Sequence, residues 1–436
     1  QAAIQSAIQS VRHRITIDSI SGYALLFKDV IPSDFLRKTD PTQRQRGFGH
    51  VPVFWAWLGQ ILEANASCSK ALGLIQAWYN TSGLPVPTGG TAGYCRARLR
   101  IKENFLEGIA TKTTQHLSSQ IRPVDQWHGH TLKSIDGSSA ILMDTEANQQ
   151  TYPQPASQKP GCGFPQMGFV GVLNHSHGGW EGYETCPSTR HDARVAPRLL
   201  RHIDKGDLLL ADRAFCTYEF IALLLAENAD VLMRLHQARH RKLDWRRGKK
   251  ISPMERLVTW KQPNQQPPGS ELSQEEWNAL PDELTLRYIK MGYENRAGEK
   301  QMLVVVSSLL DPEKYDALEL SNLYAERWQI EIKLRDIKTT LGMEKFAVKT
   351  PEMAHKTLWM LMIAYNLTKY QMQQAAAEAG KPLNEMSFRG TVGLITSSHE
   401  SLRPLREKPK KLVECLKAII TLCATKLWTL IHHRNF

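Results

Sequence analysis

From about residue 126 the chain changes from helical to strand-like sequence, and the order of these segments limits the possible folds. Strand-like runs cover 131–144, 166–176 and 206–215, a helical pattern follows over 218–229, and another strand run covers 230–236. This order is typical of a layered α/β domain. The run "LLLAD" is apolar until Asp212. Since an isolated buried carboxylate is costly, we expect Asp212 at the rim of the layer, paired or metal-bound, or as an N-cap.

Helical sequence flanks this α/β core, and a basic, β-rich segment interrupts it. Residues 1–125 predict helices separated by turns, and in the run 94–117 basic residues precede an amphipathic stretch. This pattern fits a helical N-terminal DNA-binding region, and a plain solvated helix is the alternative. The core covers 126–236 and 313–380, separated by a basic, β-rich insertion over 237–312. Residues 381–436 predict a C-terminal helical region with an apolar helix over 411–431. We therefore expect one interrupted core with helices on both sides.

The charge of the chain favours a polyanionic partner. Lys and Arg number 55 against 43 Asp and Glu, a formal charge of +12. Basic residues concentrate in the insertion, where Arg246 and Arg247 lie next to Trp245, a composition that suits contact with nucleic acid. Seven cysteines without a CxxC pair indicate a reduced compartment. No apolar run reaches the length of a membrane span, so we expect a cytoplasmic protein without a membrane partner.

A second candidate site lies on an amphipathic helix predicted over 322–342. At about 100° per residue, four polar residues share one stripe: Tyr324, Arg327, Glu331 and Lys338. This stripe borders the apolar stripe that the helix would bury, formed by Leu323, Ile330, Leu334, Ile337 and Leu341. A solvated charge face is one interpretation. The other is that an aromatic hydroxyl, two basic side chains and a carboxylate together serve an anionic ligand and a metal.

Three carboxylates distant in sequence are the candidate metal ligands. An α/β layer could bring Asp136, Asp212 and Glu331 together, and such a site holds two divalent ions for attack on a phosphodiester. Hard oxygen ligands select Mg²⁺ or Mn²⁺. Asp136-Gly137 between apolar segments also indicates a hairpin turn, and Asp144 is the replacement candidate if the turn interpretation holds.

Three motifs in order connect the chain with a known family. The pattern Tyr-x2-Arg-x3-Glu-x6-Lys is met without a gap by the stripe on 322–342, "SIDGSS" contains Asp136, and "LLLADRAF" contains Asp212. With these motifs the sequence resembles the bacterial insertion-sequence DDE transposases of the family named for insertion sequence four. The similarity extends over roughly residues 45–375.

The resemblance implies a ribonuclease-H-like catalytic core interrupted by the β-rich insertion. Asp136, Asp212 and Glu331 would be catalytic ligands of two Mg²⁺ or Mn²⁺ ions, and three residues would grip DNA phosphates: Tyr324, Arg327 and Lys338. A homodimer would act on double-stranded DNA, at transposon end repeats and target DNA, in association with the bacterial nucleoid. The implied function is metal-dependent cleavage at transposon ends and strand transfer into target DNA. The alternatives are a nuclease of the same fold without strand transfer, or an inactive DNA-binding regulator.

Some relatives cut the second strand through a DNA hairpin, which requires a base held on an aromatic face. The insertion offers Trp245, Trp260 and Trp277 for this role. Trp260 is the preferred candidate because it lies on a predicted strand, which would hold a stacking surface rigidly. The alternative is that each tryptophan packs inside the insertion.

Overall fold

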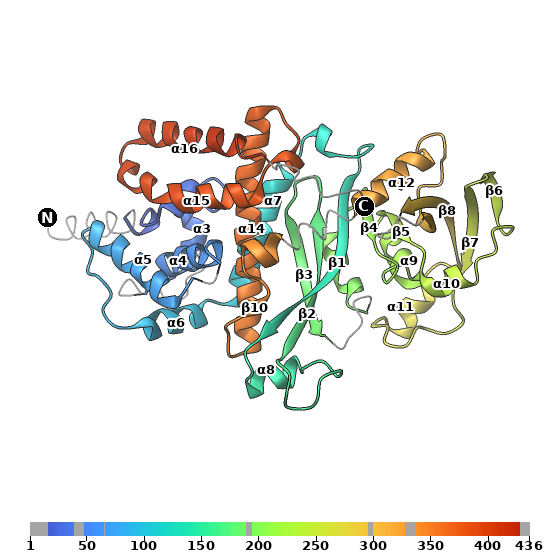
Figure 1. Ribbon diagram of the computed structural model, residues 1–436, viewed down its shortest axis with the longest axis horizontal. Coiled ribbons are helices and arrows are strands. Elements are labelled where there is room, and N and C mark those ends of the chain that lie inside the picture. The colour runs from blue at the N-terminus through green and yellow to red at the C-terminus, as the bar shows by residue number, and fades with distance from the viewer. Residues whose placement is uncertain are drawn as a thin grey trace. The chain divides into compact units, whose positions relative to one another are not determined.

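Figure 1 shows the computed structural model of the chain, in which residues 16–38, 48–64, 66–188, 194–294, 300–327 and 336–427 are described. These residues separate into two compact units. The helical unit comprises the described parts of Gln1–Ile121 and Arg335–Thr429 together with His177–Gly179. The sheet unit comprises Arg122–Ser176 and the described parts of Trp180–Leu334. Helical sequence from both ends of the chain thus belongs to one unit.

The helical unit combines an N-terminal and a C-terminal set of elements. The first set is α2 (Gly22–Leu26), α3 (Ser33–Lys38), α4 (His50–Leu62), α5 (Cys68–Thr81), α6 (Thr91–Arg100) and α7 (Glu103–Ser118). The second set is β10 (Lys345–Phe346), α14 (Pro351–Ala379), α15 (Phe388–Leu402) and α16 (Pro409–Ala424). The run 94–117 is divided between α6 and α7, because Ile101 is buried and has extended backbone (φ −63°, ψ 123°). The expected helix over 411–431 is α16, which begins at Pro409 and ends at Ala424.

Helix α14 is the central element of the helical unit and packs against both α7 and α16. It begins where its sequence predicts: the Thr350 hydroxyl accepts a hydrogen bond from the Met353 amide at 3.3 Å, and Pro351 occupies the first turn. It ends at Gly380, whose φ of 60° favours glycine. Asn366 in its buried middle donates to the Thr113 hydroxyl at 3.2 Å. This buried amide of α14 thus finds a polar partner on α7.

The sheet unit is organised around one mixed sheet with the strand order β3-β2-β1-β4-β5-β9-β8-β7-β6. The strands are β1 (Thr131–Leu142), β2 (Gln166–Asn174), β3 (Trp180–Pro187), β4 (Asp207–Ala211), β5 (Asp230–Arg234), β6 (Lys249–Ser252), β7 (Glu255–Lys261), β8 (Glu283–Glu294) and β9 (Lys300–Ser307). Strand β2 is antiparallel to β1 and β3, whereas β4 and β5 continue the sheet parallel to β1. The helices are α8 (Glu146–Thr151), α9 (Tyr218–Ala226), α10 (Gln237–Arg241), α11 (Gln274–Asn278) and α12 (Ala317–Glu326). The expected α/β class is confirmed.

The insertion over 237–312 continues the sheet of the core. Strand β9 pairs antiparallel with the core strand β5 on one side and with β8 on the other. Strands β7 and β6 follow β8 in the same sheet. One pleated surface therefore connects the insertion to the strands that carry the candidate carboxylates (Figure 1).

Each face of the sheet buries its own apolar cluster. Leu209 and Ala211 of β4 face a cluster that contains residues of α9, whereas Leu208 and Leu210 face a cluster that contains residues of α12. Because successive residues of a strand point to opposite faces, a strand covered on both faces is apolar at every position. This explains the uninterrupted run that ends at Asp212.

Candidate active site

Two of the three expected carboxylates occupy neighbouring positions on neighbouring strands. Ile135 of β1 pairs in parallel register with Ala211 of β4, so Asp136 and Asp212 each follow one member of this pair. Adjacent strands lie about 4.8 Å apart. Asp136 is an interior residue of β1, so the hairpin-turn interpretation of Asp136-Gly137 is wrong. Asp144, the replacement candidate, lies beyond the end of β1 and accepts a hydrogen bond from Gln149 at 2.9 Å.

The alternation of the strands assigns these carboxylates to the face covered by α12. Leu208 and Leu210 precede Asp212 on that face, and Leu132 precedes Asp136 on it by four residues. Arg234 lies beside Asp212 on the next strand, because Met233 of β5 pairs with Ala211 of β4. We call these three residues the Asp136–Asp212–Arg234 row. The sequence shows Arg234 only as the start of a basic cluster, since its place in the row depends on strand pairing.

Helix α12 brings two residues of the polar stripe to the same face. The Asp316 side chain caps its N-terminus by accepting from the Leu318 and Glu319 amides at 2.8 and 3.2 Å. Tyr324 is 2 % exposed, and Arg327, at the C-cap, is 7 % exposed. The solvated-face interpretation is therefore wrong for these two residues.

The electrostatics of Tyr324 connect it with the row. Burial raises the pKa of the Tyr324 hydroxyl well above its usual range, Arg327 and Arg234 oppose this shift, and Asp212 adds to it. The Arg327 guanidinium carbon lies 5.9 Å from the centre of the Tyr324 ring. Tyr324 thus keeps its proton at neutral pH and remains a hydrogen-bond donor beside a carboxylate and two guanidinium groups.

The remaining members of the polar stripe are described incompletely or belong to the other unit. Glu331 lies outside the described residues. Lys338 lies in the helical unit, within the helical residues 336–340, and is half-buried. Of the apolar stripe, Leu323, Ile337 and Leu341 are buried as predicted.

The two carboxylates of the row fit a hard divalent cation. Among the described residues no group of three or more His, Cys, Asp and Glu side chains is placed to hold a metal ion. Asp136 and Asp212 nevertheless supply carboxylate oxygens from adjacent strands, the ligand type that Mg²⁺ and Mn²⁺ prefer. The third expected carboxylate, Glu331, belongs to the undescribed segment that directly follows α12.

Comparison with known proteins agrees with the family to which the motifs point. Residues 127–367, more than half of the chain, match the family described as "Transposase DDE domain". The chain belongs to this family. It is also 26 % identical, over 363 residues, to transposase InsG for insertion sequence element IS4 of Escherichia coli strain K12, and the match covers 81 % of this chain and 77 % of that protein. The expected membership among insertion-sequence DDE transposases is confirmed.

The family gives the row a chemical context. A DDE transposase acts on DNA, and the family generally uses divalent metal ions. The matched segment includes the Asp136–Asp212–Arg234 row and α12. Along the described segments, no helix combines the length and the apolar character needed to cross a membrane.

The insertion of the transposase exposes the basic residues expected to contact DNA. The side chains of Arg246 and Arg247 are 92 % and 84 % exposed. Trp245, which directly precedes them in the sequence, is half-buried, and its indole nitrogen donates to the Pro253 carbonyl at 3.0 Å. The Lys290 ammonium lies 4.1 Å from the centre of the Trp245 ring. Asp244 pairs with both arginines, so this corner of the insertion carries a net positive charge.

The expectation that Trp260 is a base-stacking residue needs correction. Trp260 lies on β7 as predicted, but it is 2 % exposed and its indole nitrogen donates to the Tyr288 hydroxyl at 2.6 Å. The Arg239 guanidinium carbon lies 3.7 Å from the ring centre. Trp277 is also buried, at 3 % exposure. Since stacking requires an open aromatic face, Trp260 is a core residue in this structure, and Trp245 is the more accessible of the three tryptophans.

Proposed function

We propose that this transposase cleaves phosphodiester bonds at the ends of its element and joins those ends to target DNA. Asp136, Asp212 and Glu331 would hold two Mg²⁺ or Mn²⁺ ions. The observation that carries the proposal is the parallel register that sets Asp136 beside Asp212 at the carboxyl end of β4. Metal ions bound there would activate a water or a 3′ hydroxyl and stabilise the leaving oxygen.

The strand order supports a ribonuclease-H-like core for this chemistry. A long central strand, β1, is flanked by antiparallel β2 on one side and by parallel β4 and β5 on the other. Both described carboxylates lie on β1 or directly after β4. A rigid sheet holds acidic residues in place more accurately than loops do.

Basic and hydroxyl groups around the row would bind the DNA phosphates. Arg327 and Tyr324 approach from α12, and Arg234 lies in the row itself. Guanidinium groups suit phosphates because they donate in a planar, bidentate arrangement. Lys338 would add a further phosphate contact, and the exposed Arg246 and Arg247 would neutralise the DNA backbone. We propose that a homodimer binds double-stranded DNA in this way.

The test is a cleavage assay with Mg²⁺ and a duplex that carries the terminal repeats of the element. We expect Asp136→Asn and Asp212→Asn each to lower the single-turnover cleavage rate by roughly 10³-fold or more. DNA affinity should change less than about threefold, because the basic surface supplies most of it. Glu331→Gln should behave like these two variants.

The matched control is Asp144→Asn, which removes a carboxylate just beyond the end of the same strand and should cleave normally. Cleavage that survives in the Asp136 and Asp212 variants would contradict the proposed site. Wild-type protein that cuts but never joins ends would be a nuclease, and protein that binds end DNA without cutting it would be a regulator.

A further inference from the structure

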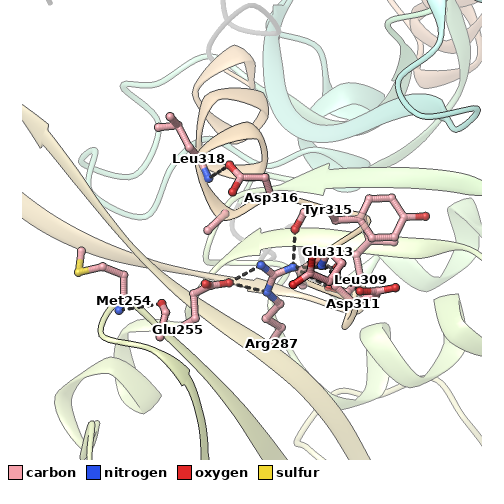
Figure 2. A network of polar contacts seen from close by, with 12 residues as sticks. Met254, Glu255, Arg287, Leu309, Asp311, Glu313, Tyr315, Asp316 and Leu318 are labelled. Atoms are coloured by element: carbon pink, nitrogen blue, oxygen red, sulfur yellow. Dashed lines mark hydrogen bonds and ion pairs between the residues drawn. The ribbon is translucent and has the colours of Figure 1, made fainter.

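A buried arginine of the insertion reaches the segment in front of α12 (Figure 2). Arg287 on β8 is fully buried, and its Nε donates to a Glu255 carboxylate oxygen on β7 at 2.8 Å. Its Nη2 donates to the same carboxylate oxygen. Glu255 is itself 7 % exposed. The insertion thus buries a complete ion pair at its junction with the core.

The free end of this guanidinium binds backbone rather than another side chain. Arg287 Nη1 donates to the Tyr315 carbonyl at 2.7 Å and lies 3.4 and 3.5 Å from the carbonyls of Leu309 and Asp311. All three carbonyls belong to the connection between β9 and α12. Figure 2 shows Arg287 between Glu255 on one side and these carbonyls on the other. One side chain therefore contacts three carbonyls of the segment that leads into α12.

Residues that precede β1 also contact Tyr315. Its hydroxyl lies 3.0 Å from His130 Nε2, and its ring stacks on Trp127 with centres 5.7 Å apart and planes 21° apart. Asp316, the N-cap of α12, follows directly. His128 reaches the first turn of α12, where its Nε2 lies 2.9 Å from Glu319. The start of α12 is thus held between the insertion and the residues in front of β1.

The geometry points to a role for Arg287 in catalysis through this contact. We propose that Arg287, held by Glu255, is a positioning residue: it fixes the start of α12 and thereby places Tyr324 and Arg327 at the Asp136–Asp212–Arg234 row. The inference rests on the proposed function, because it assigns those residues to a DNA-cleaving site. Helix α12 has ten residues and is about 15 Å long. A tilt at its first turn therefore moves the residues at its far end.

A role in fold stability alone is the competing explanation, and it makes a different prediction. Two methionines of similar length commonly replace a buried ion pair without loss of stability, because both desolvation costs disappear together. The double variant Glu255→Met/Arg287→Met should therefore fold normally. It lacks the donor to the Tyr315 carbonyl, so it separates a stabilising role from a positioning role.

The experiment measures cleavage and local order in the same variants. For Glu255→Met/Arg287→Met we expect single-turnover cleavage of end DNA about 10–100-fold slower than wild type, the scale that small misplacements of reacting groups cause. The dissociation constant for end DNA should stay within about threefold, because the exposed basic surface is intact. Backbone amides of 315–327 should exchange hydrogen faster, while the melting temperature stays close to that of wild type.

The matched control is Arg256→Lys. Arg256 on β7 also donates to backbone carbonyls, those of Trp245 and Ser252, both at 2.9 Å, but these lie inside the insertion. We expect wild-type cleavage and wild-type exchange over 315–327 in this variant. Arg287→Lys keeps the charge and shortens the reach, so it provides the same readouts if the double variant does not fold.

Normal cleavage and normal exchange over 315–327 in the double variant would overturn the positioning role. Hydrogen exchange also separates this inference from the proposed function. If wild-type protein does not cleave end DNA, the proposed function fails. Faster exchange over 315–327, absent from Arg256→Lys, would then still support the contact between Arg287 and α12, and unchanged exchange would overturn it.

Discussion

Two residues of β1 with opposite charges point to opposite faces of the sheet and have different partners. Asp136 faces α12, whereas Lys133, three residues earlier, points to the other face and is 1 % exposed. The Lys133 ammonium donates to the carboxylates of Asp207 and Asp204 at 2.7 and 3.0 Å and to the His202 carbonyl at 2.9 Å. Buried charges of this kind need complete pairing. The acidic residues around Lys133 thus pair with its ammonium group.

His202, next to this network, predicts a specific loss of stability in acid. Burial, helped by Arg201 and Lys133 and opposed by Glu181 and Asp204, lowers the pKa of His202 to about 4. In the unfolded chain the pKa is about 6.5. Between these values the unfolded state binds more protons, so the free energy of unfolding decreases as the pH falls through this window. The contribution is complete above pH 6.5 and amounts to at most about 3 kcal/mol.

Denaturant unfolding at pH 7 and pH 4 checks this expectation with His202→Gln, which cannot titrate. Wild-type protein should lose up to about 3 kcal/mol more than the variant between the two pH values. Equal losses would show that His202 is not a buried neutral group in the folded state.

At the scale of elements, α14 shows how local sequence sets the limits of a helix. Thr350 and Pro351 begin it, and Gly380 ends it with φ at 60°. An alanine at Gly380 would be forced into the left-handed region, although no atom lies within 4 Å of the added Cβ. By contrast, Gly393 within α15 has ordinary backbone and equally open surroundings. Two glycines of one unit therefore differ only in backbone conformation.

The same substitution at these two glycines should have opposite effects. Gly380→Ala should lower the free energy of unfolding by about 1–2 kcal/mol, the cost of the left-handed conformation. Gly393→Ala should raise it by about 0.5–1 kcal/mol, because alanine loses less entropy in a helix. Thermal unfolding followed by circular dichroism measures both. Stabilisation by both variants would mean that Gly380 does not adopt a left-handed conformation in solution.

The sequence predicted those elements whose signals are local. The capped ends of α14 and the apolar run of β4 are examples, and the family motifs pointed to Asp136 and Asp212, which follow the paired residues Ile135 and Ala211. Strand β3 was missed because glycine and glutamate interrupt its apolar pattern. These interruptions are tolerated because β3 lies at the end of the strand order. Asp136-Gly137 has the local pattern of a turn, and it forms part of a strand because Asp136 pairs with Gly171 of β2. The role of Arg234 in the row and the burial of Trp260 depend on the same kind of non-local contact.

At the scale of the whole molecule, the two ends of the described chain complete one helical unit. The Trp78 indole donates to Glu400 at 2.8 Å, and the Arg403 guanidinium donates to the Ile20 carbonyl at 2.9 Å. The buried Lys356 ammonium of α14 donates to the Leu99 carbonyl at 2.9 Å. These partners are more than 250 positions apart. The sequence of the sheet unit therefore lies between the two segments that form most of the helical unit.

This arrangement predicts that the helical regions fold only together. In a fragment of residues 1–121, α7 lacks its contact with α14, and isolated helices of this length are marginally stable in water. We expect little helical circular dichroism from this fragment and no cooperative melting. Mixing it with a fragment of residues 336–427 should restore both, because α14 then covers the apolar faces of the N-terminal helices. A fragment of residues 122–334 should have no such effect. Cooperative melting of residues 1–121 alone, at the temperature of the full chain, would show instead that the N-terminal helices form a domain by themselves.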